Sequence, residues 1–374
     1  MAGDRSPTIG NTKPVMNRRQ FVKTATTLAA ALATTPALPV SAAAMTPTAR
    51  RLPRWRGFNL PDKCNARREG NPPYRESDFE IIAEWGFDFA RLPMSYLCWA
   101  AQDEPLKLRE TELEHVSQAV EFGRKHHVHI NLNLHRAPGY CVNPPEEPTN
   151  LWKDEQALEA CAFHWSHLAR RFKGIPNERL SFDLLNEPAR ISEETYVRVV
   201  KRLVQAIRAE DPPRLIIADG LQWGRNPVHG LADLGIAQST RGYDPMEVSH
   251  YKAGWVTGAD KWAEPTWPLL RRDKAMMDKA ALRKDRIEPW KKLEQKGVGI
   301  HVGEWGAHNQ TPHAVALAWM RDQLALWQEA GWGWALWNLH GSFGVLNSHR
   351  ADVQYEEFRG HKLDREMLKV LQAG

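Results

Sequence analysis

Two glutamates stand in equivalent places, each directly after an apolar, strand-like segment. Residues 180–185 lead into Asn186-Glu187-Pro188, and 117 residues after Glu187 the segment 298–303 leads into Glu304. Polar groups that follow parallel strands gather at one edge of a sheet, where side chains from different strands can surround a ligand. Two carboxyl groups placed in this way have the chemistry to cleave an acetal. One can protonate the leaving oxygen, while the other attacks the carbon or activates water.

Other apolar segments also end on polar or aromatic side chains, and they span residues 56–59, 90–93, 134–140, 248–250 and 334–338. In this order, and together with residues 186–188 and 303–306, these motifs resemble glycoside hydrolase family 5, the cellulase-type family of retaining β-glycosidases. The resemblance covers roughly residues 54 to 340. It implies an enzyme that needs no metal or cofactor and hydrolyses β-linked polysaccharide or oligosaccharide.

The resemblance gives chemical roles to the two glutamates, to Arg91 and to Asn186. Glu187 corresponds to the acid/base of the family and Glu304 to its nucleophile. Arg91 would donate two hydrogen bonds to Glu304 and keep it ionised, because a nearby cation favours the charged carboxylate. Asn186 would donate to the sugar 2-hydroxyl or to the nucleophile. The competing interpretation of each glutamate is a structural ion pair.

Supporting roles follow for four more residues. His135 and His250 would orient the carboxylates and the sugar hydroxyls, although a single histidine is usually structural. Trp337 resembles the platform beneath the sugar next to the scissile bond, because flat aromatic rings pack on the apolar faces of sugars. The family commonly has His-x-Tyr on its sixth strand, with the tyrosine bonded to the nucleophile. This chain reads His250-Tyr251-Lys252, so Tyr251 is a candidate for that role, and a hydroxyl from elsewhere is the alternative.

Sixteen tryptophans are many for a chain of 374 residues, and glycan binding would supply a reason for them. Four that follow strand ends could extend a cleft, with core packing as the equal alternative: Trp99, Trp223, Trp255 and Trp305. Four others lie in helical segments, where we expect them to pack in the core: Trp85, Trp152, Trp165 and Trp319.

The motifs recur at intervals that suit repeated βα units. The pattern predicts strands near residues 54–59, 87–92, 128–134, 180–185, 214–218, 246–250, 298–303 and 332–337. Eight parallel strands joined by helices predict an α/β fold of the (β/α)₈ TIM barrel type, with the site at the carboxyl ends of the strands. An open doubly wound sheet is less favoured, because no glycine-rich phosphate loop follows the first strand.

The N-terminal segment is typical of an export signal. Arg18-Arg19 precedes a short Ala/Thr/Leu stretch and an Ala-rich cleavage region, which predicts a twin-arginine-type signal peptide over residues 1–44. Met16 is an alternative start. We therefore expect residues 45–374 to form one catalytic barrel domain that is exported to the periplasm or the extracellular space.

The net charge and the cysteines limit which binding partners, disulfides and metal sites the sequence supports. The segment 1–44 holds five basic residues and one acidic residue, so its removal lowers the formal net charge from +5 to +1. A nearly neutral surface gives no reason to expect nucleic acid or membrane binding, and we expect a monomer. Cys161 lies in a helical pattern and should pack in the core, whereas two of Cys64, Cys98 and Cys141 could pair. Their spacing is not that of a zinc site.

These observations favour an endo-β-1,4-glucanase among the activities of the family. A mannanase and a β-1,3 or mixed-linkage glucanase remain alternatives, because the loops that select sugar hydroxyls are not resolved by sequence alone. A barrel that binds carbohydrate without cleaving it is a third alternative. The paired glutamates argue against it, since a binding protein needs the tryptophans but not the two acids.

Overall fold

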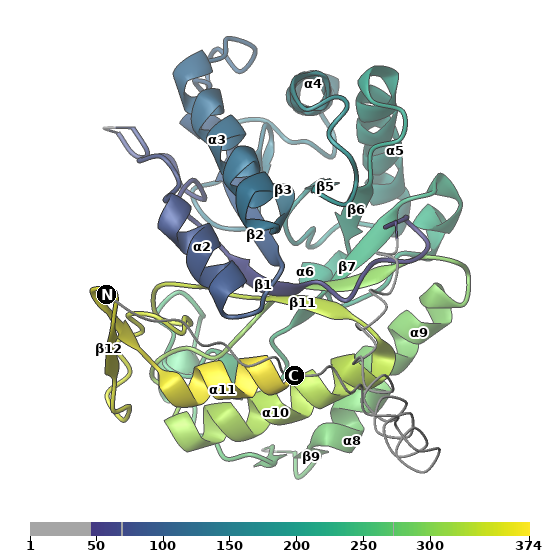
Figure 1. Ribbon diagram of the computed structural model, residues 1–374. Helices are drawn as coiled ribbons and strands as arrows, with labels where there is room; N and C mark the ends of the chain where they lie inside the picture. The colour runs from purple at the N-terminus through teal and green to yellow at the C-terminus, as the bar shows by residue number, and fades with distance from the viewer. Residues whose placement is uncertain (1–45, 69, 272) are drawn as a thin grey trace, which may run out of the picture. The chain divides into compact units, whose positions relative to one another are not determined.

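Eight parallel strands close into a ring in the computed structural model, which describes residues 46–374 apart from 69 and 272 (Figure 1). The ring strands are β1 (Arg56–Asn59), β2 (Phe89–Ser95), β3 (His129–Ala137), β5 (Leu180–Asp183), β6 (Ile216–Asp219), β7 (Ala237–Gly242), β10 (Ile300–Trp305) and β11 (Gly333–Leu336). Each pairs with the next along the chain, and β11 pairs with β1. The predicted (β/α)₈ barrel is confirmed.

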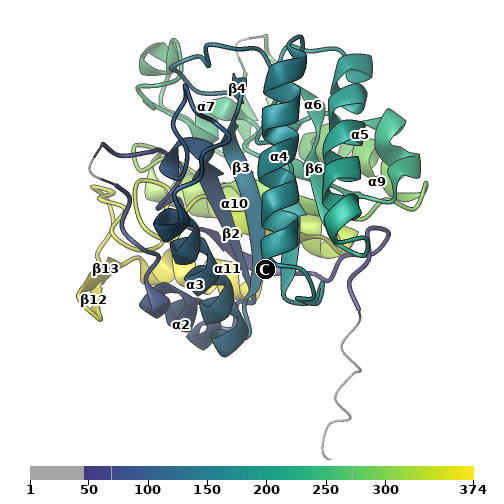
Figure 2. The ribbon, with the colours of Figure 1, turned by 90° about the horizontal axis from the view of Figure 1, so that it is seen from above.

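Helices connect the strands and cover the outside of the ring, as α4 and α5 do side by side in Figure 2. The longer helices are α2 (Glu76–Glu84), α3 (Glu110–His126), α4 (Glu155–Arg171), α5 (Glu193–Glu210), α9 (Glu288–Glu294), α10 (His313–Ala330) and α11 (Arg365–Ala373). In α5 the buried residues include Val199, Val200, Leu203, Val204 and Ile207. This three-to-four spacing gives the helix one apolar face toward the strands.

Short elements fill the connections. The helical turns are η1 (Tyr96–Cys98), α6 (Leu221–Gly224), η2 (His229–Leu234), α7 (Met246–Ser249), η3 (Ala259–Lys261), α8 (Lys279–Leu282) and η4 (Arg283–Ile287). The short strands are β4 (Tyr140–Cys141), β8 (Leu269–Leu270), β9 (Met276–Met277), β12 (Glu356–Phe358) and β13 (His361–Leu363). β4 pairs with β3, β8 with β9, and β12 with β13, all antiparallel.

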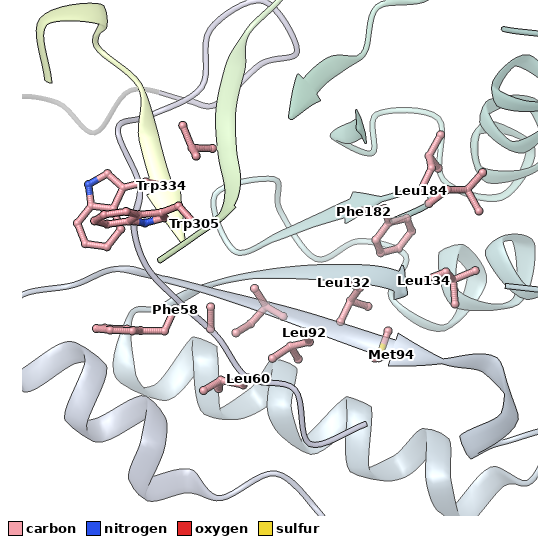
Figure 3. Close-up of a cluster of buried hydrophobic side chains, with 14 of the residues drawn as sticks. Phe58, Leu60, Leu92, Met94, Leu132, Leu134, Phe182, Leu184, Trp305 and Trp334 are labelled. Atoms are coloured by element: carbon pink, nitrogen blue, oxygen red, sulfur yellow. The ribbon is translucent and has the colours of Figure 1, made fainter. Parts of the chain in front are cut away.

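Side chains along the ring strands alternate between an apolar outer face and a polar inner face, as the period of two in a strand requires. Leu92 and Phe182 belong to the buried cluster between strands and helices (Figure 3). Their neighbours Arg91 and Asp183 lie on the opposite face and bond to each other across the ring interior. A smaller apolar cluster fills the ring near the amino ends of the strands: Leu52, Trp55, Phe89, Leu215, Ile217, Ala237 and Ala335. The polar residues therefore converge nearer the carboxyl ends.

The predicted sixth strand is wrong. Residues 246–249 form the short helix α7, and the sixth barrel strand is β7, nine residues earlier. β7 reads Ala-Gln-Ser-Thr-Arg-Gly and is fully buried, although four of its six residues are polar. A search for apolar segments passes over it, because its polar groups find partners inside the protein rather than in solvent.

The predicted signal peptide over residues 1–44, with Met16 as an alternative start, lies outside the described residues. Within the part that is described, no helix is both long and apolar enough to span a membrane.

Candidate active site

A cavity of about 620 Å³ opens at the carboxyl ends of the barrel strands. Both glutamates line it, and so do Asn186, His135, His250 and Trp337. Further lining residues come from the loops after the strands: Cys64, Asn65, Asn143, Pro144, Trp223, Arg225, Arg241, Tyr243, Asp244, Met246, Trp255 and Phe343. Six of the eight candidates from the sequence thus meet around one space, and Arg91 lies directly beneath it, bonded to Glu304 and Asn186.

Glu304 is held by three donors. Its Oε1 accepts hydrogen bonds from Arg91 Nη1 at 2.6 Å and from Arg241 Nη2 at 3.4 Å. Its Oε2 accepts from the Tyr243 hydroxyl at 3.1 Å. Burial and the nearby glutamates hold the pKa of Tyr243 well above its ordinary value, so this hydroxyl keeps its proton and donates. Two guanidinium groups and one hydroxyl therefore converge on this carboxylate, an arrangement that suits a nucleophile.

Arg91 is fully buried, and its guanidinium donates hydrogen bonds to four acceptors. Besides Glu304 it bonds Asp183 Oδ2 at 2.8 Å, Asn59 Oδ1 at 3.0 Å and Asn186 Oδ1 at 2.9 Å. The Asn186 Oδ1 contact fixes that amide with its nitrogen facing the other way. Asn186 Nδ2 has no hydrogen-bond partner among the described residues, although it is buried and lines the cavity. A free buried donor of this kind can serve a bound hydroxyl.

Glu187 sits in a different environment. Its Oε1 accepts one hydrogen bond, from Arg241 Nε at 3.1 Å, and 15% of its side chain is exposed. Burial, together with the charge of Glu304, raises the pKa of Glu187 to about 8 even though Arg241 acts against the shift. At neutral pH this carboxyl therefore carries a proton that it can donate. The two glutamates thus lie in unequal surroundings, as an acid and a nucleophile in one site require.

Arg241 was not among the residues picked out from the sequence. It comes from β7 and bonds both glutamates, Asn186 and Asp219. Strand β7 ends on Arg241-Gly242 and Tyr243 follows it directly, so Arg241-Gly242-Tyr243 has the spacing of the family's His-x-Tyr motif. This motif lies in a polar segment that does not resemble a strand in its pattern of hydrophobicity.

The same observation corrects the role considered for Tyr251, which was to bond the nucleophile. Tyr251 is buried outside the cavity lining, where its ring faces Lys252 Nζ at 5.0 Å and its backbone oxygen accepts from His308. Tyr243 supplies the hydroxyl that bonds Glu304. The shift of eight residues follows from the misplaced sixth strand.

The two histidines line the cavity without bonding either glutamate. His135 stacks on Trp337 with ring centroids 5.6 Å apart, and burial, followed by the charges of Arg91 and Arg241, holds its pKa well below the ordinary value. His250 packs on Tyr243 at 4.9 Å, and burial lowers its pKa to about 3. Both rings are therefore neutral, and in the structure they support aromatic neighbours rather than the carboxylates.

The tryptophans divide by burial. Trp223, Trp255 and Trp337 line the cavity, and Trp255 is 62% exposed. Trp99 and Trp305 are buried in the core, so the suggestion that they extend the cleft is wrong. Among the helical tryptophans, Trp85, Trp165 and Trp319 are buried as expected, and Trp152 is partly buried against the same core.

The cysteines are all free thiols, so the suggested pairing among Cys64, Cys98 and Cys141 is not formed. Cys161 is buried in α4, as expected. In the range 46–374, setting aside residues 69 and 272, no group of three or more His, Cys, Asp or Glu side chains is placed to hold a metal ion.

A model of the Cellulase family, glycosyl hydrolase family 5, matches residues 45–342. The chain belongs to this family. Endoglucanase C of Acetivibrio thermocellus is 26% identical over 305 residues, which cover 75% of this chain and 88% of the relative. A crystal structure described as a glycoside hydrolase is 37% identical, covers 86% of this chain and 99% of that one, and superposes with a TM-score of 0.82. Endoglucanase Cel5A of Thermotoga maritima, at 22% identity, 85% and 96% coverage and a TM-score of 0.69, shares the fold. The family 5 chain is a cellulase-like glycoside hydrolase that acts on O-glycosyl bonds.

Proposed function

We propose that this family 5 enzyme is an endo-β-1,4-glucanase that hydrolyses with retention, with Glu187 as acid/base and Glu304 as nucleophile. The observation that carries the assignment is the unequal surroundings of the two carboxyl groups. Glu304 faces two guanidinium groups and a tyrosine hydroxyl, whereas Glu187 faces one guanidinium and has a pKa of about 8. One group thus faces two cations and a hydroxyl donor, and the other carries a transferable proton in the same cavity.

In the first step the Glu304 carboxylate attacks the anomeric carbon while Glu187 gives its proton to the leaving oxygen, so that a glycosyl ester forms and the aglycone departs. In the second step Glu187, now ionised, takes a proton from water. The resulting hydroxide oxygen bonds to the carbon, and the ester to Glu304 breaks. The unpartnered Asn186 Nδ2 would hydrogen-bond the sugar 2-hydroxyl, a contact that strengthens in the transition state.

The substrate proposal draws on the curated relative named above, an endoglucanase that the chain spans almost in full. Three tryptophans along the cavity suit a chain of pyranose rings, because each indole can cover the apolar face of one sugar. Mannan and β-1,3 or mixed-linkage glucan are the competing substrates.

Release of reducing ends from carboxymethyl cellulose, glucomannan, lichenan and laminarin tests the substrate. We expect the highest kcat/KM on carboxymethyl cellulose, with a rapid fall in viscosity that marks internal cleavage. Proton NMR of the first product should show the β-anomer. A preference for glucomannan or laminarin would replace the glucanase assignment, initial α-anomer would mean inversion, and turnover of none of the four would contradict the proposal.

Trp337 provides a test of the sugar platform. Its ring lines the cavity above His135 and is only partly buried, so Trp337→Ala should leave the melting temperature close to that of the wild type. We expect kcat/KM to fall by roughly twofold to tenfold, since an aromatic face contributes about 0.5–1.5 kcal/mol beyond its buried area. Trp262→Ala, also partly buried but outside the cavity lining, is the control. Unchanged kinetics for Trp337→Ala would make this ring structural.

We also propose that the enzyme is exported by the twin-arginine-type segment at residues 1–44 and acts outside the cytoplasm as a monomer, with residues 45–374 as its catalytic domain. The proposal rests on Arg18-Arg19, the apolar stretch and the Ala-rich region of the sequence. A polymeric β-glucan also requires an enzyme outside the membrane.

A further inference from the structure

One guanidinium group joins the two glutamates. Arg241 Nε donates to Glu187 Oε1 at 3.1 Å, and Arg241 Nη2 reaches Glu304 Oε1 at 3.4 Å. The same Nη2 also donates to Asn186 Oδ1 at 2.9 Å. Because the guanidinium is planar and rigid, these contacts fix how far apart the two carboxyl groups lie and how they face each other.

Asp219, at the end of β6, completes this arrangement. Its two oxygens accept from Arg241 Nη1 at 2.9 Å and from Arg241 Nη2, a bidentate pair. Asp219 Oδ2 also accepts from the backbone N–H of Glu187 at 2.8 Å. Glu187 has a φ of +51°, an unfavourable conformation for a residue other than glycine. The pair therefore holds Glu187 by two hydrogen bonds. Asp219 accepts from its backbone N–H, and Arg241 donates to its carboxyl group.

The surrounding backbone leaves space for this arginine. A Cβ atom on Gly303 would lie 2.7 Å from Arg241 Nη1, and one on Gly224 would lie 2.6 Å from Arg241 Cγ. At Gly303 the register between β7 and β10 shifts, and Glu304 becomes the direct partner of Arg241. Two glycines on different segments thus make room for one side chain that is 2% exposed.

Arg241 occupies the position in Arg241-Gly242-Tyr243 where the family commonly has histidine. The two are not equivalent, because a buried histidine loses its charge readily, as His135 and His250 do here. An arginine stays charged and presents several donors in one plane.

We propose that Arg241 and Asp219 act as a positioning pair that sets the separation of Glu187 and Glu304 and the charge balance between them. The proposal rests on the roles given to the two glutamates above. Neither member of the pair reacts. Arg241 supplies the fork that orients both carboxyl groups, and Asp219 neutralises part of its charge, so that Glu187 keeps the proton it must donate.

The charge around Glu187 decides the direction of the expected effects. The groups that face it are Glu304 from β10, Arg241 from β7, Asp219 from β6, Arg91 from β2, and the uncharged Tyr140 and Cys141 of β4. Removing the Arg241 cation should favour the protonated form of Glu187, and removing the Asp219 anion should favour the ionised form. A purely structural pair would give no such opposite shifts.

The experiment compares pH profiles of kcat/KM for the wild type, Arg241→Met, Arg241→Lys and Asp219→Asn. The wild-type basic limb should lie near pH 8, because activity is lost as Glu187 ionises. Arg241→Met should raise that limb by about 1–3 pH units, the range for loss of a nearby opposite charge. Asp219→Asn should lower it. Arg241→Lys should keep the limb near that of the wild type but lower kcat by roughly tenfold or more while KM changes little, since the rigid fork is lost.

The matched control is Arg214→Met. Arg214 is a buried arginine that pairs with Asp211 and backbone carbonyls away from the cavity lining. We expect it to lower stability without moving the pH limb. The same result for Arg241→Met and Asp219→Asn, with both limbs unmoved, would overturn the proposal. If Arg241→Met does not fold, Asp219→Asn and Arg241→Lys still decide between the outcomes.

A measurement without substrate separates this proposal from the proposed function. In protein with ¹³C-labelled glutamate carboxyl groups, the Glu187 signal is the one missing from Glu187→Gln. Its titration midpoint should rise in Arg241→Met and fall in Asp219→Asn. These shifts in an enzyme that cleaves no glycan would contradict the proposed function and leave the electrostatic role intact, whereas normal hydrolysis with unmoved midpoints would contradict the role of the pair alone.

Discussion

Glu304→Ala is expected to abolish hydrolysis of polysaccharide and of activated aryl glycosides alike, because no other group can form the bond to the anomeric carbon. Glu187→Ala is expected to act selectively. It should lower kcat/KM on β-glucan by about 10²–10⁴-fold, the usual contribution of a general acid, and affect 2,4-dinitrophenyl glycosides far less. Such leaving groups depart without protonation. The measurement is kcat/KM of each variant on both kinds of substrate.

Azide distinguishes the two roles further. With the Glu187 variant, azide should attack the glycosyl ester and yield a β-azide, whereas with the Glu304 variant any product should be an α-azide from direct displacement. Proton NMR of the anomeric signal reads the outcome. Glu112→Gln, which alters a glutamate paired with buried Lys63 outside the cavity lining, is the control and should keep wild-type kinetics. The opposite azide pattern would exchange the assignments of acid and nucleophile.

The barrel and the two glutamates could be predicted from sequence because the outer face of each strand is apolar and the segment ends on a polar motif. β5 is typical, with Phe182 packed outward and Asn186-Glu187 following the strand. Seven of the eight strands lie where the sequence predicts them. The hydrogen-bond partners of Glu304 were predicted only in part. Arg91 was expected to donate two hydrogen bonds to Glu304 and donates one, and the structure adds Arg241 from β7 and Tyr243, the residue after β7.

The failures share a physical cause. Polar side chains that are satisfied by buried partners leave no trace in a pattern of hydrophobicity, as Gln238 shows by exchanging two hydrogen bonds with the Val228 backbone. The pattern of hydrophobicity also does not show which individual tryptophans are buried. Trp305 follows Glu304 directly, yet the alternation of the strand turns its ring toward Trp327 and Trp334 in the core. Which of two neighbouring side chains faces the cavity depends on the register of the strand, and the bulge at Gly303 changes that register.

Arg91→Met is expected to destabilise the folded protein by about 3–5 kcal/mol, the usual cost of leaving buried charges without their partner. Arg91 is fully buried and bonds both Asp183 and Glu304, so its loss leaves two carboxyl groups without this cation. Urea unfolding measures the change. Arg214→Met, the matched buried arginine, should also destabilise the fold but should retain kcat, whereas Arg91→Met should lose activity even in the fraction that remains folded.

The pH dependence of this loss gives the sharper result. Burial and the charge of Asp219 already raise the pKa of Asp183 to about 7, and Arg91 acts against that shift. Without Arg91 the pKa rises further, so the folded state of the variant binds more protons at neutral pH than the unfolded chain does. Its stability should therefore fall as the pH rises from about 4, the ordinary pKa of an aspartate, through 7 and beyond. The deficit relative to the wild type should be larger at pH 8 than at pH 5. A deficit that does not depend on pH would show that Arg91 stabilises the barrel through packing, and that Asp183 and Glu304 do not depend on its charge.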